Sequence, residues 1–467
     1  MQSNLLKRIL FFCAIFIWLF LAISSGVLHY AYQATFDGVI FHLLYRDTLF
    51  NNGYIYPPLI IVLYVSVGCS YFIYKKFFHV YKKALLLTTI IALLIINQSL
   101  SITDYIKTSM INSRFYEDYW QEPEAKYNHP IKTNLVILLL ESIEDSFSNP
   151  KVLGFDAVPN LFKHKNKGIS FDNYQQASGT WWSIASVVSS WCGIPLVLPI
   201  EYNLVYNTNH FLPNAICLSD ILKSHDYTIL YTKGASSIFA GLDIFLQSHG
   251  VEAKNIIDIK NYFSSNKENL VSWGAADSVV YENFKQKLQE LSKQENPFFA
   301  TMQTINTHFP FNEIDKDCKV SNSEFADVVK CSDRQAGDFI DWFLEQDFAQ
   351  NTVLVVIGDH KFMDTRLGVT LLTPQKERRI YNLFINSKAK PEGGTGRSFT
   401  QLDLFPSILE SIGMEVKNRR AGLGVSIFAP KTHQTLLEKL GQKELDKQLL
   451  ARDPIYNSFL STKQGSK

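Results

Sequence analysis

A hydroxyl, two carboxylates and two imidazoles follow the most regularly patterned segments of this sequence. Thr180 lies in residues 179–185, with the sequence GTWWSIA, which predicts a loop that turns into a helix. Unpaired N–H groups and the helix dipole at such a point favour negative charge, so the Thr180 hydroxyl is a candidate nucleophile for a phosphoryl or sulfuryl group. A simple helix N-cap is the alternative, and for Thr180 taken alone it is the stronger interpretation.

Apolar runs separated by helical patterns predict the architecture around this hydroxyl. Buried strands are expected at residues 134–140, 227–231, 298–302 and 353–357. Helical patterns lie between them at residues 215–224, 273–291 and 332–345. This alternation predicts an α/β domain with a mostly parallel central sheet, in which functional groups gather at the carboxyl ends of the strands.

Three of the four predicted strands lead into candidate functional residues. Glu141 follows the first strand, His308 comes shortly after the third, and Asp359 and His360 follow the fourth. Each instance alone is weak, because a carboxylate after a strand is often a helix cap. Together Glu141, Asp359 and His360 offer oxygen and nitrogen donors for a divalent cation, which would lower the pKa of the Thr180 hydroxyl and make Thr180 a fourth ligand.

The first third of the chain predicts transmembrane helices. Uncharged apolar stretches run from residue 9 to 36, from about 55 to 74, and from 84 to about 102, each long enough to cross a bilayer. Basic residues precede the first stretch and separate the second from the third: Lys7, Arg8, Lys75, Lys76, Lys82 and Lys83. Positive-inside bias puts these residues in the cytoplasm and everything after Asp104 outside it. No cleavable signal peptide is expected, and the first stretch is interpreted as a retained anchor.

The predicted organisation has four parts. They are a membrane domain at 1–104, a membrane-proximal linker helix within 105–132, an extracytoplasmic catalytic domain at 133–430, and a charged, peripheral tail at 431–467. Lys and Arg number 45 against 44 for Asp and Glu, so no overall charge points to a nucleic-acid partner.

Cysteine usage fits an oxidising compartment for the soluble part. Cys13 and Cys69 lie inside predicted spans, whereas the other four cysteines follow them in the soluble part. The simplest pairing joins Cys192 with Cys217 and Cys318 with Cys331, although spacing does not fix the connectivity. No cysteine and histidine spacing suggests zinc held by thiolates.

These motifs resemble the alkaline phosphatase/sulfatase superfamily. Within it the chain is similar to the membrane-anchored, lipoteichoic-acid-synthase-like branch and to its phosphoglycerol-transferase group. The resemblance covers roughly residues 134–428, and its most specific segments are residues 179–196, 234–250, 273–277 and 401–409.

The resemblance implies one divalent metal ion, Mn or Mg before Zn, held by Glu141, Thr180, Asp359 and His360. Thr180 would be the nucleophile that is transiently esterified, and His308 would contact the substrate phosphate and protonate the leaving group. Threonine at this position argues against sulfate ester hydrolysis, because sulfatases generally convert a Cys or Ser to formylglycine.

Further residues are candidate substrate contacts. Leu242 stands where related enzymes often carry a basic residue, and Lys233 or Lys361 could supply that charge. Asp243 and Trp182 are further candidate substrate contacts, although core packing is the stronger interpretation of Trp182.

The implied function is transfer of a phosphoglycerol group from a membrane phospholipid, phosphatidylglycerol, to an envelope glycan. The protein would be multi-pass in the bacterial inner membrane, with its catalytic domain in the periplasm near its lipid donor. One alternative is a phosphoethanolamine transferase acting on lipid A or another envelope glycan, a branch with more histidine ligands and more disulfides. The other is a non-catalytic envelope protein that keeps the fold as a binding module.

Overall fold

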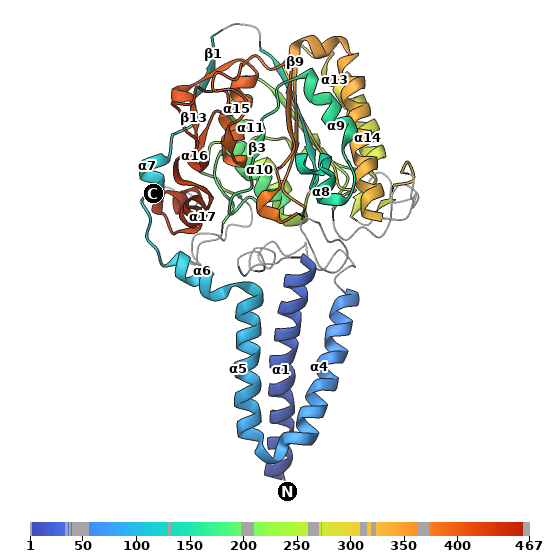
Figure 1. Cartoon of the computed structure of the whole chain (residues 1–467), viewed down its shortest axis with the longest axis vertical. Coiled ribbons are helices and arrows are strands. Elements are labelled where there is room, and N and C mark those ends of the chain that lie inside the picture. Colours follow the sequence, from blue (N-terminus) through green and yellow to red (C-terminus); the bar gives the residue numbers. More distant parts are fainter. Residues whose placement is uncertain are drawn as a thin grey trace. The chain divides into compact units, whose positions relative to one another are not determined.

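A computed structural model gives the structure of the chain (Figure 1), and its described residues form two compact units that divide between Met110 and Ile111. The structure describes residues 2–32, 36, 39, 56–128, 132–197, 210–259, 270–271, 273–308, 315–318, 324–362 and 373–460.

Three long helices form the first unit, where the sequence predicts transmembrane segments. They are α1 (Gln2–Tyr32), α4 (Tyr56–Phe77) and α5 (Tyr81–Leu100), and the short helix α6 (Ile102–Ser109) follows them. Helix α1 packs against both α4 and α5, and the three run side by side in Figure 1.

Two continuous apolar stretches in this unit are long enough to cross a membrane, Asn4–His29 and Leu59–Leu100. The second contains 42 residues because only one 3-10 turn, Phe78–Val80, separates α4 from α5. Large apolar side chains face outward from these helices, including Tyr64 (73% exposed) and Leu94 (64%). Such surfaces suit contact with lipid, so the first unit is a membrane region.

A six-stranded sheet forms the centre of the second unit. In spatial order its strands are β10 (Asn382–Ile385), β9 (Thr352–Gly358), β2 (Asn134–Leu140), β8 (Phe298–Gln303), β4 (Thr228–Lys233) and β5 (Ile256–Asp258). Only β10 runs antiparallel to its neighbour. The central strands are apolar on both faces, as expected for a parallel sheet covered on both sides. The predicted α/β class with a mostly parallel sheet is confirmed.

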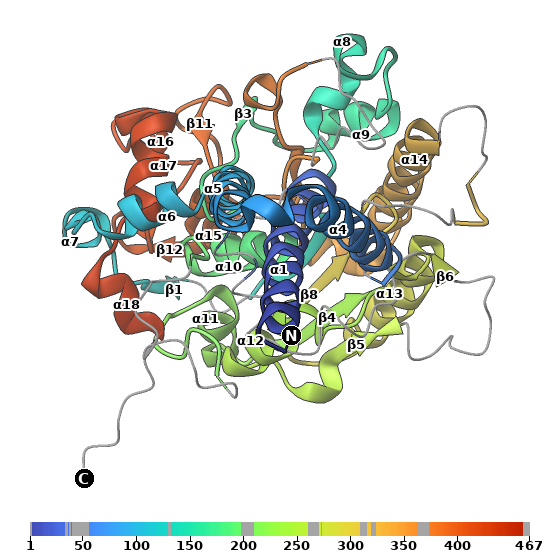
Figure 2. The ribbon, with the colours of Figure 1, turned by 90° about the horizontal axis from the view of Figure 1, so that it is seen from below.

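Helices cover both faces of this sheet, and Figures 1 and 2 agree on their grouping. One face carries α9 (Pro159–His164), α13 (Asp277–Leu291) and α14 (Glu324–Leu344), and the other α10 (Ser183–Cys192), α11 (Leu218–Ser224) and α15 (Leu404–Ser411). The remaining elements are α7 (Phe115–Tyr119), α8 (Pro150–Leu153), α12 (Leu242–Ser248), α16 (Leu436–Leu440), α17 (Gln442–Leu450), α18 (Pro454–Leu460), β1 (Ala125–Tyr127), β3 (Asn173–Tyr174), β6 (Leu270–Val271), β7 (Gly274–Ala275), β11 (Ser398–Phe399), β12 (Met414–Val416), β13 (Arg420–Ala421) and β14 (Gly424–Val425).

The segments at the two ends of the soluble part differ from the prediction. Residues 105–132 do not form one linker helix, because the chain becomes extended at Trp120 and strand β1 then pairs antiparallel with β12. Pro123, which lacks the N–H a helix needs, stands between the two. The tail is helical in α16 to α18, but it is not peripheral, since Tyr456 and Phe459 of α18 are buried in the second unit.

Both predicted disulfides are confirmed, Cys192 with Cys217 and Cys318 with Cys331. The first joins the end of α10 to the residue that precedes α11, and Cys13 and Cys69 are free.

Removing the first disulfide should destabilise the second unit. The bond closes a sequence separation of 25 residues, so replacing Cys192 and Cys217 by alanine should lower the free energy of unfolding by about 3 kcal/mol. Thermal unfolding of the full chain measures this, with the Cys13→Ala/Cys69→Ala protein as the control. Equal unfolding midpoints in the two proteins would contradict the expectation.

Candidate active site

The candidate ligands meet because the strands that carry them are neighbours. Strands β9, β2, β8 and β4 are adjacent and parallel, so their carboxyl ends lie along one edge of the sheet. Leu140 pairs with Gly358 in the β2–β9 register, which places Glu141 beside Asp359. The structure therefore brings together the residues that the sequence singled out at three strand ends.

Glu141, Asp359 and His360 form a compact, fully buried cluster. Their potential ligand atoms all lie within 4.8 Å of one another. His360 Nε2 lies 3.4 Å from Glu141 Oε1 and 3.5 Å from Asp359 Oδ2. Asp359 Oδ1 accepts hydrogen bonds from the backbone N–H groups of Ser142 (2.7 Å) and His360 (2.8 Å), whereas its Oδ2 is buried without a hydrogen-bond partner.

The electrostatics of this cluster fit a divalent cation. Burial raises the pKa of Asp359 to about 7, and the neighbouring charge of Glu141 adds to this effect. Burial also tends to raise the pKa of Glu141, but the charges of His360 and His308 and hydrogen bonds from Ser142 and Ser183 lower it overall. Two buried carboxylates, one with a partnerless oxygen, beside an imidazole nitrogen are donors that a divalent cation could use.

The backbone around Glu141 is held by the neighbouring strand ends. Its N–H donates to the Thr304 hydroxyl at 2.8 Å, and the Thr307 hydroxyl donates to its carbonyl oxygen. Gly358 must be glycine, since a Cβ there would lie 2.0 Å from the carbonyl oxygen of Ile143. This close approach sets β9 against the turn that follows β2.

Two serine hydroxyls donate to Glu141. Ser142 Oγ, from the adjacent residue, donates to Oε1 at 2.8 Å. Ser183 is the first residue of α10, and its Oγ donates to Oε2 at 3.0 Å. One turn later on the same helix, Ser186 Oγ donates to the carbonyl oxygen of Asp359 at 2.6 Å. Helix α10 therefore contacts both acidic members of the cluster through hydroxyls three residues apart.

Thr180 lies in the turn before α10 and faces other partners. Its hydroxyl donates to the carbonyl oxygen of Ala177 (2.8 Å) or to Gln401 Oε1 (2.9 Å), and it accepts from the Ala177 N–H at 3.2 Å. The N-cap alternative is wrong, because the N-cap of α10 is Trp182. Ser183 was not among the residues predicted from the sequence, although a hydroxyl at the expected helix start was the available signal.

His308 and Lys233 lie around the same cluster. His308 is half-buried, and its ring centroid is 4.3 Å from that of Trp273. The charge of His308 lowers the pKa of Glu141. Lys233 ends β4 and is 6% exposed; burial lowers its pKa, while the charges of Asp258, Glu141 and Asp359 oppose that shift.

Lys361 directly follows His360 and is also buried. Its Nζ donates to Gln175 Oε1 at 2.9 Å, and burial lowers its pKa to about 8. Lys233 therefore interacts with the carboxylates of the cluster, whereas the acidic neighbours of the Lys361 amine are Glu144 and Asp446.

The other two predicted substrate contacts stand on separate elements. Trp182 is half-buried, with its ring 5.9 Å from that of Trp181. Asp243 is in the first turn of α12, and its N–H donates to the carbonyl oxygen of Ser237 at 2.9 Å.

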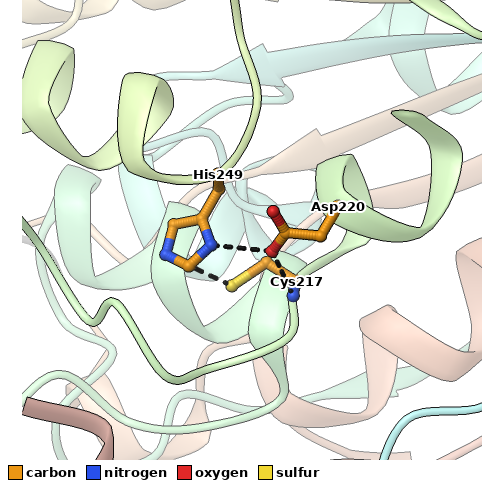
Figure 3. Close-up of side chains that lie close together, drawn as sticks. All are labelled: Cys217, Asp220 and His249. Carbon is orange, nitrogen blue, oxygen red and sulfur yellow. Dashed lines mark hydrogen bonds and ion pairs between the residues drawn. The ribbon is translucent and has the colours of Figure 1, made fainter. Parts of the chain in front are cut away.

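A second group of potential ligands, Cys217, Asp220 and His249, is structural (Figure 3). The Cys217 sulfur is already bonded to Cys192, so it offers no thiolate to a metal. His249 Nδ1 lies 2.7 Å from Asp220 Oδ2, which also accepts the Cys217 N–H at 2.9 Å. The group fixes the start of α11 against the end of α12.

Comparison with known sequences gives the same relationship as the motifs. The sulfatase family profile matches residues 133–414, which is more than half of the chain. Phosphoglycerol transferase I of Escherichia coli O6:K15:H31 (strain 536 / UPEC) is 30% identical over 360 residues, covering 74% of this chain and 45% of that protein. That of Escherichia coli strain 55989 / EAEC is 29% identical with the same coverage. The chain spans about half the length of these curated relatives.

Solved structures share the fold. A Vibrio parahaemolyticus protein of the alkaline phosphatase superfamily aligns with a TM-score of 0.53 and 24% identity over 70% of this chain and 78% of that chain. Lipoteichoic acid synthase LtaP from Listeria monocytogenes gives 0.53 and 17% over 70% and 81%.

The integral membrane protein lipooligosaccharide phosphoethanolamine transferase A from Neisseria meningitidis gives a TM-score of 0.54 and 15% identity, over 97% of this chain and 90% of that chain. The expected alkaline-phosphatase/sulfatase-like architecture after N-terminal apolar helices is thus confirmed. With a profile match across its whole central sheet and the strand ends that carry the cluster, the chain belongs to the sulfatase family.

Proposed function

We propose that this protein is a metal-dependent transferase that moves a phosphoglycerol group from phosphatidylglycerol to an envelope glycan, with Ser183 as the nucleophile. The observation that carries the proposal is the contact between Ser183 Oγ and Glu141 Oε2 at 3.0 Å, beside a buried carboxylate and imidazole cluster. Similarity to phosphoglycerol transferase I supports the choice of transferred group.

Glu141, Asp359 and His360 would hold the divalent cation, Mn or Mg before Zn, with a hydroxyl as fourth ligand. The cation would supply Lewis-acid activation of that hydroxyl and neutralise oxyanion charge. We assign the fourth position to Ser183 in place of Thr180, because the Thr180 hydroxyl is engaged with Ala177 and Gln401.

The reaction would proceed in two displacements at phosphorus. Ser183 Oγ loses its proton to water and forms an O–P bond, while the bond from phosphorus to the diacylglycerol oxygen breaks and protonated His308 donates its proton to that oxygen. A glycan hydroxyl then attacks the phosphoserine and passes its proton to the neutral His308. The Ser183 Oγ–P bond breaks, and Ser183 Oγ regains a proton from water. Lys233 and Lys361 would face the phosphate oxygens, and Trp182 and Asp243 remain proposed contacts to the rest of the substrate.

The membrane region would hold the site near its lipid donor. In this proposal the chain is multi-pass in the bacterial inner membrane with the second unit in the periplasm, as the positions of the basic residues predict. Anchoring raises the effective concentration of a lipid that is scarce in water.

A serine nucleophile does not argue against sulfate ester hydrolysis as a threonine does, because sulfatases can convert a serine to formylglycine. A test of the function therefore has to include a sulfate ester.

The test incubates the full chain in lipid nanodiscs with glycerol-labelled phosphatidylglycerol and a periplasmic glucan. Release of diacylglycerol with label on the glucan, and a glycerophosphoryl adduct on Ser183 by mass spectrometry, are the expected results. Label transfer from phosphatidylethanolamine alone would favour the phosphoethanolamine alternative. Hydrolysis of an aryl sulfate without lipid turnover would overturn the proposal, as would the absence of any turnover with metal bound.

A further inference from the structure

The C-terminal helices grip the turn that precedes the proposed nucleophile. Residues 436–460 lie beyond the part of the chain matched by the sulfatase profile, which ends at residue 414. Helices α17 and α18 of this segment nevertheless hydrogen-bond the backbone of the turn formed by residues 176–183 and of the residues that support it.

Helix α17 binds the first part of this turn. Asp446 Oδ1 accepts the N–H of Ser178 at 2.7 Å, and Gln442 Nε2 donates to the carbonyl oxygen of Gln176 at 3.0 Å. Gln442 also donates to Asp446 Oδ2 at 2.9 Å, which orients the carboxylate toward the turn. A hydrogen bond from a backbone N–H to a carboxylate is among the stronger hydrogen bonds in proteins.

Helix α18 binds residues 195–197, which support the same turn from its other side. The N–H of Leu196 donates to the carbonyl oxygen of Gly179 at 2.8 Å. Tyr456 is buried (4% exposed). Its hydroxyl accepts the N–H of Val197 at 3.0 Å and donates to the carbonyl oxygen of Val197 (2.9 Å) or Pro195 (3.1 Å). Gly179 has φ +75°, and a Cβ there would lie 2.7 Å from Pro195 Cβ, so the turn and this segment are closely fitted.

Helix α18 is itself braced by the segment around α7. The rings of Tyr116 and Tyr456 have centroids 5.7 Å apart, and those of Trp120 and Phe459 are 4.7 Å apart. Asp453 Oδ2 accepts the N–H of Tyr116 at 3.1 Å. Tyr456 is therefore packed as well as hydrogen-bonded, which gives its hydroxyl a fixed position.

We propose that residues 436–460 are a clamp that holds the 176–183 turn in place, with Asp446 and Tyr456 as positioning residues for Ser183. Ser178 is five positions from Ser183, so displacement of the turn would displace the hydroxyl from Glu141. Misplacement of a reacting group by about 1 Å can reduce a rate by roughly 100-fold. The inference rests on the proposed function only for its catalytic readout.

The test uses the full chain and three variants. Asp446→Ala removes the acceptor for Ser178, Asp446→Asn keeps an oxygen acceptor at the same place, and Tyr456→Phe removes only a hydroxyl. Lys443→Ala, on the exposed side of α17, is the matched control. Hydrogen exchange measured by mass spectrometry on peptides covering residues 176–183 and 193–197 reports the turn, and turnover kinetics report Ser183.

Asp446→Ala and Tyr456→Phe should each speed exchange in these peptides about tenfold. They should also lower kcat about tenfold while KM changes less than twofold, because bound substrate would still meet the same pocket groups. Lys443→Ala should stay close to wild type in both measurements. Asp446→Asn, which keeps the acceptor for Ser178 but loses the one for Gln442, should lie between wild type and Asp446→Ala.

Unchanged exchange in both Asp446→Ala and Tyr456→Phe would overturn the clamp, whatever the enzyme's substrate proves to be. Faster exchange in a protein that has no phosphoglycerol transferase activity would support the clamp and count only against the proposed function.

Discussion

Replacing Ser183 by alanine is expected to lower phosphoglycerol transfer by roughly 1,000-fold or more, as removal of a nucleophile does in other enzymes. The reason is geometric. Ser183, at the start of α10, donates a hydrogen bond to Glu141 Oε2 at 3.0 Å, and Ser186, one turn later, donates one to the carbonyl oxygen of Asp359. Turnover of labelled phosphatidylglycerol in nanodiscs measures the effect. The glycerophosphoryl adduct expected on Ser183 should be absent from the variant.

Thr180→Val is the matched variant for this prediction. Valine keeps the shape of threonine but loses the bonds to Ala177 and Gln401, so a fall of about tenfold through loosening of the turn is expected. If Thr180→Val is inactive and Ser183→Ala retains turnover, the nucleophile is Thr180 as the sequence alone suggested. An adduct on Thr180 would lead to the same conclusion.

The second large effect is expected from Asp359→Asn. The asparagine keeps an oxygen that can accept the N–H groups of Ser142 and His360, but it removes the charge of the buried, partnerless Oδ2. Bound metal should fall from one ion per chain to a small fraction, and turnover should fall by roughly 1,000-fold. Elemental analysis of the purified protein gives the metal content, and the thermal midpoint shows whether the fold is kept.

Chelation is the companion measurement for the same site. Removal of the metal from the wild-type chain should abolish turnover, and Mn or Mg should restore it better than Zn. A second variant, Asp446→Asn, should retain wild-type metal content, because the Asp446 side chain hydrogen-bonds Ser178 and Gln442 and not Glu141, Asp359 or His360. Full turnover after complete metal removal would contradict the roles given to Glu141, Asp359 and His360.

Most of the fold was predictable because its signals are local. The strands β2, β8 and β9 are continuous apolar runs, and apolar length alone predicts the helices α1, α4 and α5. The two disulfides followed from pairing neighbours along the chain. The linker and the tail were not predictable in the same way, because their contacts are remote in sequence: β1 pairs with β12, some 290 residues away, and α18 packs against the segment around α7.

The sequence by itself predicted that Glu141, Asp359 and His360 lie together, because parallel strands end at one edge of a sheet and these residues directly follow their strands. Only the tertiary structure decided which hydroxyl faces that cluster. Thr180 and Ser183 are three residues apart and chemically alike, and both suit the start of a helix. Their directions are set by the turn, by Gln401, and by the position of α10 against the strand ends, which are contacts made between segments remote in sequence.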